Sequence, residues 1–215
     1  MAESVSVDVL VVGSGASGLA AAVSAHRAGV RVALAAKGSL QSCNSAKAQG
    51  GIQAAFGTDD STEQHADDVW KSSHETADRR LVEILTGEAP GAIHWLEELG
   101  VEFTRENGGY RLAKCGGASR KRLLQVGDRT GHAITAAFRD AVEASPVKTF
   151  AKSPLSSLEP AANGWRAVCG KRPPTFQPPY PVSPHRRQCL PPRIHMVFLT
   201  AQRSCRLGCP RNCNS

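Results

Sequence analysis

The spacing of apolar and polar positions near the N-terminus predicts a strand, a helix and a second strand in direct succession. Residues 5–12 are apolar at all but two positions, as in a strand buried on both faces of a parallel sheet. The alanine-rich stretch 19–28 predicts a helix that Gly29 can end, and residues 30–34 predict the next strand. Two strands joined in this way by a helix form a parallel pair.

Further periodic patterns extend this α/β alternation to about residue 170. Asp60 or Ser61 is the expected N-cap of the next helix, Pro90 the expected start of another, and Thr130 the expected N-cap of the last. We expect helices over 62–72, around 81–85, over 90–99 and over 132–144, a sheet strand over 147–152, and a hairpin of 155–158 with 165–168.

The first predicted strand ends in a turn with the glycine spacing G-x-G-x-x-G. Gly13 permits the turn, Gly15 lets the backbone approach a pyrophosphate, and Gly18 lets the helix pack close on the strand. The start of the helix then presents free N–H groups and the positive end of its dipole to phosphates. We therefore expect a dinucleotide site made by Gly13, Ser14, Gly15, Ala16, Ser17 and Gly18.

The end of the second strand departs from the usual dinucleotide pattern. Ala35, Ala36 and Lys37 stand where a typical fingerprint has an acidic residue that accepts the ribose hydroxyls. Ordinary NAD recognition therefore loses support. Lys37 either contacts ribose or phosphate or is a solvated lysine at the end of a strand, and spacing alone leaves both open.

A second glycine-containing segment, residues 44–55, is small and polar, so it can lie flat against a planar ligand. Gly50 and Gly51 allow backbone N–H groups to face flavin ring atoms without obstruction by side chains. Alone, this segment is an ordinary turn. At its distance from the first turn, with Ala48-Gln49-Gly50-Gly51 and with Lys37, it resembles the flavoprotein family of succinate dehydrogenase, fumarate reductase and L-aspartate oxidase.

Other blocks match the same family, and together the resemblance covers residues 5–170. It implies an α/β, Rossmann-like FAD-binding domain with three layers and a parallel central sheet, incomplete in this chain. Asn44 stands where members that attach FAD covalently have a histidine, so non-covalent FAD is expected. The further matching blocks are 59–61, 65–68, 116–122 and 128–134. The implied FAD contacts are the turn 13–18, Lys37, Asn44, Ser45, Ala48, Gln49, Gly50 and Gly51.

The resemblance also implies hydride transfer through flavin N5 to or from a C4-dicarboxylate. Arg120 and Arg122 are candidates for a carboxylate clamp, because a guanidinium offers a planar bidentate fork. Their alternative role is in surface salt bridges. Cys115 stands where L-aspartate oxidases have a glutamate, which favours a fumarate reductase type and keeps L-aspartate oxidase as the alternative. The family's proton-donating arginine lies beyond the matched portion, so no catalytic residue is assigned and activity as an enzyme stays open.

Composition divides the chain near residue 170. Residues 171–215 hold eight basic residues, no acidic residue and nine of the 13 prolines, which leaves 18 basic and 19 acidic residues in the rest. We expect a domain over 1–170 and a disordered tail without regular elements, interpreted as a frameshift product that replaces the family's cap region, with a genuine interaction tail as the alternative. A non-catalytic flavin-binding fragment is therefore a further alternative. A basic tail of this kind predicts no specific nucleic-acid partner.

The remaining predictions concern location and partners. No cationic segment precedes an apolar core at the N-terminus, and no apolar run approaches the roughly 20 residues of a membrane span. The first 170 residues have three cysteines without metal spacing, so a reducing cytoplasm is expected. No metal is expected from Cys205, Cys209 and Cys213 either, because they lack a paired C-x-x-C. The implied partners are a dicarboxylate substrate and an electron-transfer subunit.

Overall fold

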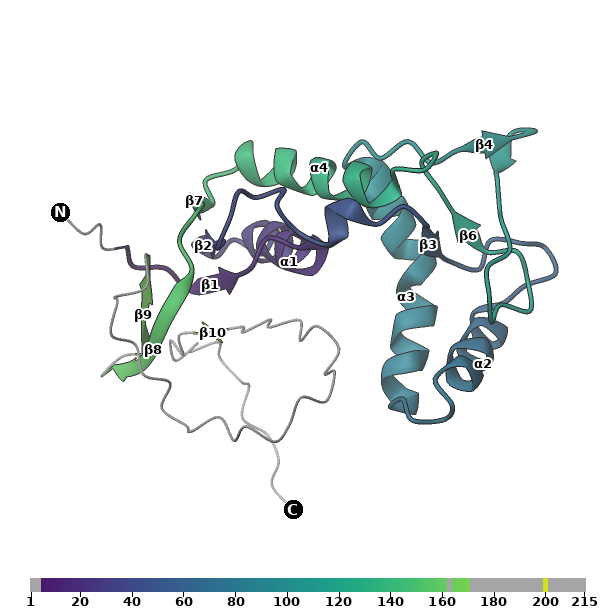
Figure 1. The fold of residues 1–215 in the computed structure, drawn as a ribbon, viewed down its shortest axis with the longest axis horizontal. Coiled ribbons are helices and arrows are strands. Elements are labelled where there is room, and N and C mark those ends of the chain that lie inside the picture. Colours follow the sequence, from purple (N-terminus) through teal and green to yellow (C-terminus); the bar gives the residue numbers. More distant parts are fainter. Residues whose placement is uncertain (1–4, 162–163, 171–198, 201–215) are drawn as a thin grey trace, which may run out of the picture.

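The computed structural model describes residues 5–161, 164–170 and 199–200 (Figure 1). Its sheet has the strand order β10-β1-β2-β7. Strands β1 (Val9–Val12), β2 (Val32–Ala35) and β7 (Lys148–Phe150) are parallel, with Val9 opposite Val32 and Ala33 opposite Lys148. The two-residue strand β10 (Leu199–Thr200) pairs with β1 in the antiparallel direction. The parallel arrangement expected from the apolar pattern is confirmed.

Two helices cover this sheet and supply much of the core. Helix α1 (Ala16–Arg27) contacts β1 and β2, and α4 (Thr130–Glu143) packs against α1. All four residues of β2 are buried, as expected for a strand between two neighbours. Gly29, at a φ of +80°, follows the end of α1, and its amide donates to the His26 carbonyl at 2.8 Å. The Rossmann-like α/β class is thereby confirmed.

The chain between β2 and β7 forms a long insertion that carries a helix pair and two short ladders. Figure 1 shows α2 and α3 side by side, apart from the sheet. The insertion consists of η1 (Ser45–Lys47), β3 (Ile52–Gln53), α2 (Thr62–Ser72), α3 (Arg79–Glu98), β4 (Arg105–Glu106), β5 (Gly109–Tyr110), β6 (Leu123–Leu124) and α4. Strand β3 pairs with β6, and β4 pairs with β5, both antiparallel.

Helix α3 corrects the prediction of two helices separated at Pro90. The structure has one helix with Pro90 inside it. A proline inside a helix removes one backbone hydrogen bond and costs about 3 kcal/mol. The apolar face runs without interruption through this point, and burial of Ile93 and Leu96 beyond it offsets that cost. The buried positions, spaced alternately by four and three residues, are Val82, Thr86, Ala89, Ile93 and Leu96.

The helix caps are confirmed in one case and wrong in another. Ser61 is the N-cap of α2, and its hydroxyl accepts a hydrogen bond from the Gln64 amide at 3.2 Å. Thr130 does not cap α4 but is its first residue, so the helix begins two residues earlier than predicted. The Thr130 hydroxyl instead accepts from the Val126 amide at 3.0 Å, because the preceding turn folds back onto the helix.

The predicted hairpin is confirmed as β8 (Leu155–Ala161) and β9 (Gly164–Cys169). The prediction that the segment 171–215 has no regular element is wrong at β10, since Leu199–Thr200 form a strand on the edge of the sheet. The rest of that segment, with Cys205, Cys209 and Cys213, lies outside the described residues.

Candidate functional site

The glycine turn sits at the carboxyl end of β1 and packs as its spacing predicted. Gly13 has a φ of +110°, and its amide donates to the Ala35 carbonyl at 2.8 Å, which continues the pairing of β1 with β2. A Cβ on Gly18 would lie 2.1 Å from the Gly13 carbonyl oxygen. Helix α1 can therefore approach the turn only because residue 18 is glycine.

The N-terminus of α1 is open for an anionic group. Gly15 is its N-cap and supplies no side-chain bond, and the first turn contains no acidic residue. The first amide of the helix, that of Ala16, donates to the Ser45 hydroxyl at 3.2 Å. This contact joins the turn to η1, 29 residues further along the chain. The amides that follow Ala16 in the first turn, together with the helix dipole, suit a phosphate.

The second glycine segment is held in place by residues that follow much later in the chain. The Gly131 amide donates to the Ala48 carbonyl at 2.9 Å, and the Gln125 side chain donates to the Gly50 carbonyl at 2.8 Å. A Cβ on Gly51 would lie 2.4 Å from the Leu124 carbonyl oxygen. Residues 49–51 are nevertheless all exposed. The segment thus presents an accessible backbone on a fixed support.

The other predicted cofactor residues surround these two segments. Ser14 is buried in the turn, whereas Ser17 at the start of α1 is exposed. Lys37 is exposed two residues beyond the end of β2, and Asn44 is the exposed N-cap of η1 without a side-chain cap bond. Gln49 is exposed between Ala48 and Gly50. Their contacts with a cofactor stay predictions.

Gly131 is a residue of this site whose role the sequence did not reveal. A Cβ there would lie 2.0 Å from the Ser45 carbonyl oxygen and 2.8 Å from the Ala48 carbonyl oxygen. The start of α4 therefore rests directly on the second glycine segment. The signals in the sequence are its place in the matching block 128–134 and its position beside Thr130, at the predicted start of a helix.

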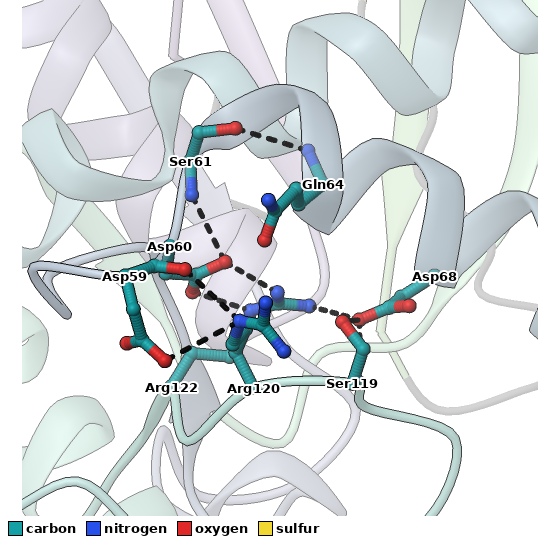
Figure 2. A network of polar contacts seen from close by, with 8 residues as sticks. All are labelled: Asp59, Asp60, Ser61, Gln64, Asp68, Ser119, Arg120 and Arg122. Carbon is teal, nitrogen blue, oxygen red and sulfur yellow. Dashed lines mark hydrogen bonds and ion pairs between the residues drawn. The ribbon is translucent and has the colours of Figure 1, made fainter.

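Arg122, one of the two predicted clamp residues, binds two carboxylates of this chain. Its Nε donates to Asp60 Oδ2 at 2.8 Å, its Nη2 to Asp60 Oδ1 at 2.5 Å, and its Nη1 to Asp68 Oδ2 at 2.6 Å. Figure 2 shows the guanidinium between the two acids. The side chains of Arg122 and Asp60 have no exposed surface, and that of Asp68 is 12% exposed. We call these three residues the ion-pair cluster.

Arg120, the other candidate, lies on the same segment but remains accessible. Its Nε donates to the Asp59 carbonyl at 2.9 Å and lies 3.4 Å from the Asp59 carboxylate, and its side chain is 41% exposed. Next to it, the Ser119 amide and hydroxyl both donate to Asp68 Oδ2, at 2.7 and 2.8 Å. The segment 119–122 is thus fixed on the loop before α2 and on α2 itself (Figure 2).

Burial and ion pairing shift the pKa values in this cluster. Burial by itself would raise the pKa of Asp60, but hydrogen bonds and charge from Arg122 outweigh it and lower the pKa below its ordinary value. The pKa of Asp68 is likewise lowered against the effect of burial, by Ser119 and Arg122. Hydrogen bonding to Asp60 raises the pKa of Arg122. All three groups are therefore charged at neutral pH.

His65 adds a buried imidazole beside the cluster. Its side chain lies on α2, the residue is 5% exposed, and Nδ1 is buried without a hydrogen-bond partner among the described residues. Burial, followed by the charge of Arg122, lowers its pKa, while Asp60 and Asp68 oppose this in part. The neutral imidazole is the form that the fold accommodates.

Mild acid should destabilise the chain through His65. The unfolded state takes up a proton first, because the pKa of His65 is lower in the folded state. The stability that depends on neutral His65 is fully present above about pH 6.5. It is lost progressively as the pH falls from there through the pKa of His65 in the folded state. The lowered pKa values of Asp60 and Asp68 add a second loss below about pH 3.9. We expect the urea midpoint of the wild-type chain to decrease from pH 7 to pH 5.

The matched variants are His65→Gln and His74→Asn. His74 is exposed just after α2 at a φ of +51°, a conformation that asparagine accepts readily. Between pH 7 and pH 5, the midpoint should change little in His65→Gln and as in wild type in His74→Asn. An unaltered pH dependence in His65→Gln would show that another group is responsible.

These features define a class of protein: an α/β domain with a glycine turn at the carboxyl end of a parallel strand, as in dinucleotide-binding folds. The family model "FAD binding domain" matches residues 8–175. The chain therefore belongs to the FAD-binding domain family, as the glycine motifs predicted. Among the described residues, no helix combines the length and hydrophobicity needed to cross a bilayer.

Two relatives show which kinds of flavoprotein this chain resembles in sequence. The chain is 36% identical to an L-aspartate oxidase of Streptomyces coelicolor, over 74% of this chain and 28% of the relative. It is 34% identical to one chain of the fumarate reductase (CoM/CoB) of Methanothermobacter marburgensis, over 70% of this chain and 28% of the relative. This chain thus spans less than a third of their length.

A solved structure is similar in fold. The structure of Mycobacterium smegmatis Sdh1 in complex with UQ1 matches with a TM-score of 0.72 and 26% identity, over 80% of this chain and 33% of that chain. The matched portion is an FAD-binding domain of the succinate dehydrogenase, fumarate reductase and aspartate oxidase oxidoreductases.

Proposed function

We propose that this chain is the FAD-binding portion of an oxidoreductase that acts on a C4-dicarboxylate, of the fumarate reductase and succinate dehydrogenase type. One observation carries the cofactor part of the proposal: the turn 13–18 and the segment 44–51 meet through Ser45, with Ser17 and Gly50 accessible. The substrate type is supported by the similarity to a fumarate reductase. The bound FAD would supply hydride transfer at its N5 atom. The protein's part is to hold and orient the cofactor and the substrate.

The described residues fit FAD at both ends of the cofactor. The uncapped start of α1, beyond Gly13 and Gly15, suits the pyrophosphate, and Lys37 is accessible for ribose or phosphate. No atom of the described residues lies within 4 Å of where a Cβ on Gly50 would be, so this face is proposed as free for the flavin ring. Asn44 offers an amide rather than an imidazole nitrogen, which supports non-covalent binding.

For the substrate, Arg120 is the stronger of the two clamp candidates. Its side chain is 41% exposed, whereas the fork of Arg122 is occupied by Asp60 and Asp68. We therefore propose Arg120 as a carboxylate contact and Arg122 as part of its support. The residues that would complete the reaction are proposed to belong to the portion of the relatives that this chain does not span.

Two alternatives keep specific support. The 36% identity to the Streptomyces coelicolor enzyme favours an L-aspartate oxidase, while Cys115, which takes the place of that family's glutamate, opposes it. The exposed stripe of Leu81 and Leu85 on α3, each 63% exposed, favours a non-catalytic flavin-binding fragment, since it leaves apolar surface uncovered.

We also propose a partner that transfers electrons, a cytoplasmic location and a domain boundary near residue 170.

A visible absorption spectrum of the purified chain tests the proposed cofactor. We expect a flavin spectrum from the folded chain and release of all flavin into the supernatant on acid precipitation. Flavin that stays with the precipitated protein would contradict non-covalent binding, and a colourless folded chain would contradict the proposed function.

The variant Gly50→Leu separates cofactor contact from folding. Its Cβ would meet no atom of the described residues within 4 Å, so the free energy of unfolding should change by no more than about 0.5 kcal/mol. The dissociation constant for FAD should rise about tenfold, because the side chain would occupy the face of the flavin. Unchanged FAD affinity in this variant would remove the segment 44–51 from the cofactor site.

A further inference from the structure

The accessible glycine segment continues directly into a very short ladder. Strand β3 begins one residue after Gly51 and pairs with β6, in which Ile52 lies opposite Leu124. Each strand has only two residues, and an isolated pair of this size is not stable in water. The ladder must therefore be held by contacts outside itself.

Arg122 provides such a contact at one end of the ladder. It immediately precedes β6, and its carbonyl accepts a hydrogen bond from the Ala54 amide at 3.0 Å, just beyond β3. The same residue carries the guanidinium that binds Asp60 and Asp68. At the other end, Leu124 touches Gly51 and Gln125 binds the Gly50 carbonyl. One residue thus connects α2 to the backbone that supports the glycine segment.

We propose that Arg122 is a positioning residue for the flavin-binding segment rather than a substrate clamp. The ion-pair cluster fixes the β3–β6 ladder on α2, and the ladder fixes Gly50 and Gly51 at the face of the flavin. This inference rests on the proposed function and assigns to Arg122 a role that acts through Ala54, Leu124 and Gln125.

The geometry requires arginine at this position. Three donors of one planar group reach two carboxylates from different parts of the chain, and no donor distance exceeds 2.8 Å. Lysine carries the same charge on a single nitrogen, so it cannot hold the Asp60 carboxylate in a fork and reach Asp68 together. Arg122→Lys therefore keeps the positive charge but no longer holds the segment that contains Gly50 and Gly51 in place.

The matched control is Arg31→Lys. Arg31 also forms a fork with one carboxylate, since its Nε and Nη2 lie 3.0 and 2.9 Å from the oxygens of Asp8. This pair is largely exposed and lies at the opposite end of β1 and β2 from the glycine turn. The control thus alters the same chemistry without touching the ladder.

Two measurements on the full chain test the inference, namely FAD titration by flavin fluorescence and amide hydrogen exchange without FAD. In Arg122→Lys we expect the FAD dissociation constant to rise about tenfold and exchange to accelerate at residues 48–54. Amides of α1 and β1 should keep their wild-type rates. In Arg31→Lys, both FAD affinity and exchange at 48–54 should match wild type.

Three results would overturn the inference. Exchange at 48–54 that stays at the wild-type rate would show that Arg122 does not hold the segment. Uniform acceleration over α1, β1 and 48–54 would indicate general destabilisation. FAD affinity that stays at the wild-type value while exchange at 48–54 accelerates would show that cofactor binding does not depend on Arg122. If the wild-type chain binds no FAD, the proposed function fails, while exchange at 48–54 still decides whether Arg122 positions the segment.

Discussion

Replacement of Arg122 by leucine is expected to lower the free energy of unfolding by about 3–5 kcal/mol. The substitution leaves the carboxylates of Asp60 and Asp68 without their shared partner and with almost no access to water. The guanidinium compensates both charges in the wild-type chain, and an uncompensated buried charge is among the most costly defects in a fold. Urea unfolding followed by circular dichroism at pH 7 measures the loss.

The comparison variant is Arg31→Leu. Its pair with Asp8 is exposed, and such pairs contribute about 0–1 kcal/mol. The expected order is therefore a large loss for Arg122→Leu and a small one for Arg31→Leu. Equal losses in the two variants would mean that the ion-pair cluster is far more hydrated than its exposure indicates. Where Arg122→Leu does not fold at all at pH 7, Asp68→Asn should show a partial loss of the same sign.

Replacement of Gly131 by alanine is expected to lower the free energy of unfolding by about 1–3 kcal/mol. It is also expected to weaken FAD binding relative to the wild-type chain. The added methyl group would lie 2.0 Å from the Ser45 carbonyl oxygen and 2.8 Å from that of Ala48. Both atoms belong to the backbone, which cannot move aside as the end of a side chain can. Helix α4 must then separate from the segment 44–51, and the Gly131 amide loses its bond to Ala48. FAD titration together with urea unfolding measures both effects.

Gly87→Ala is the control for this prediction. Gly87 lies in the middle of α3 and is exposed, and in the part of the chain that the structure describes no atom lies within 4 Å of where its Cβ would be. Alanine there should stabilise the chain by about 0.5–1 kcal/mol and leave FAD affinity unchanged. A Gly131→Ala variant with wild-type stability and wild-type FAD affinity would show that α4 does not support the segment.

Local patterns along the chain were sufficient to predict several elements. The apolar run before Gly13, the glycine spacing and Gly29 predicted β1, α1 and β2 in the correct order, because each depends on residues that are neighbours in sequence. The hairpin β8–β9 followed from its turn for the same reason. An N-cap at Asp60 or Ser61 could be predicted, and Ser61 is the cap observed, because capping joins residues only three positions apart.

Predictions that depended on distant packing were less accurate. Pro90 was interpreted as a helix start, since the sequence does not reveal that the apolar face on both sides of it would be buried together. Thr130 was interpreted as a cap, whereas its hydroxyl turns back to Val126. For Arg122 the sequence left a carboxylate clamp and a salt bridge both open, and it could not reveal Asp60 as a partner because Asp60 lies 62 residues away in the sequence.

The sequence by itself thus determined the α/β class, the glycine turn and the FAD-binding family of this chain. These depend on short-range periodicity and on the conformational freedom of particular glycines. Only the tertiary structure decided that Gly131 supports the second glycine segment and that Arg122 is enclosed by Asp60 and Asp68. The physical reason is that charge pairing and close backbone contact depend on distance in space, and segments far apart in the sequence bring these groups together.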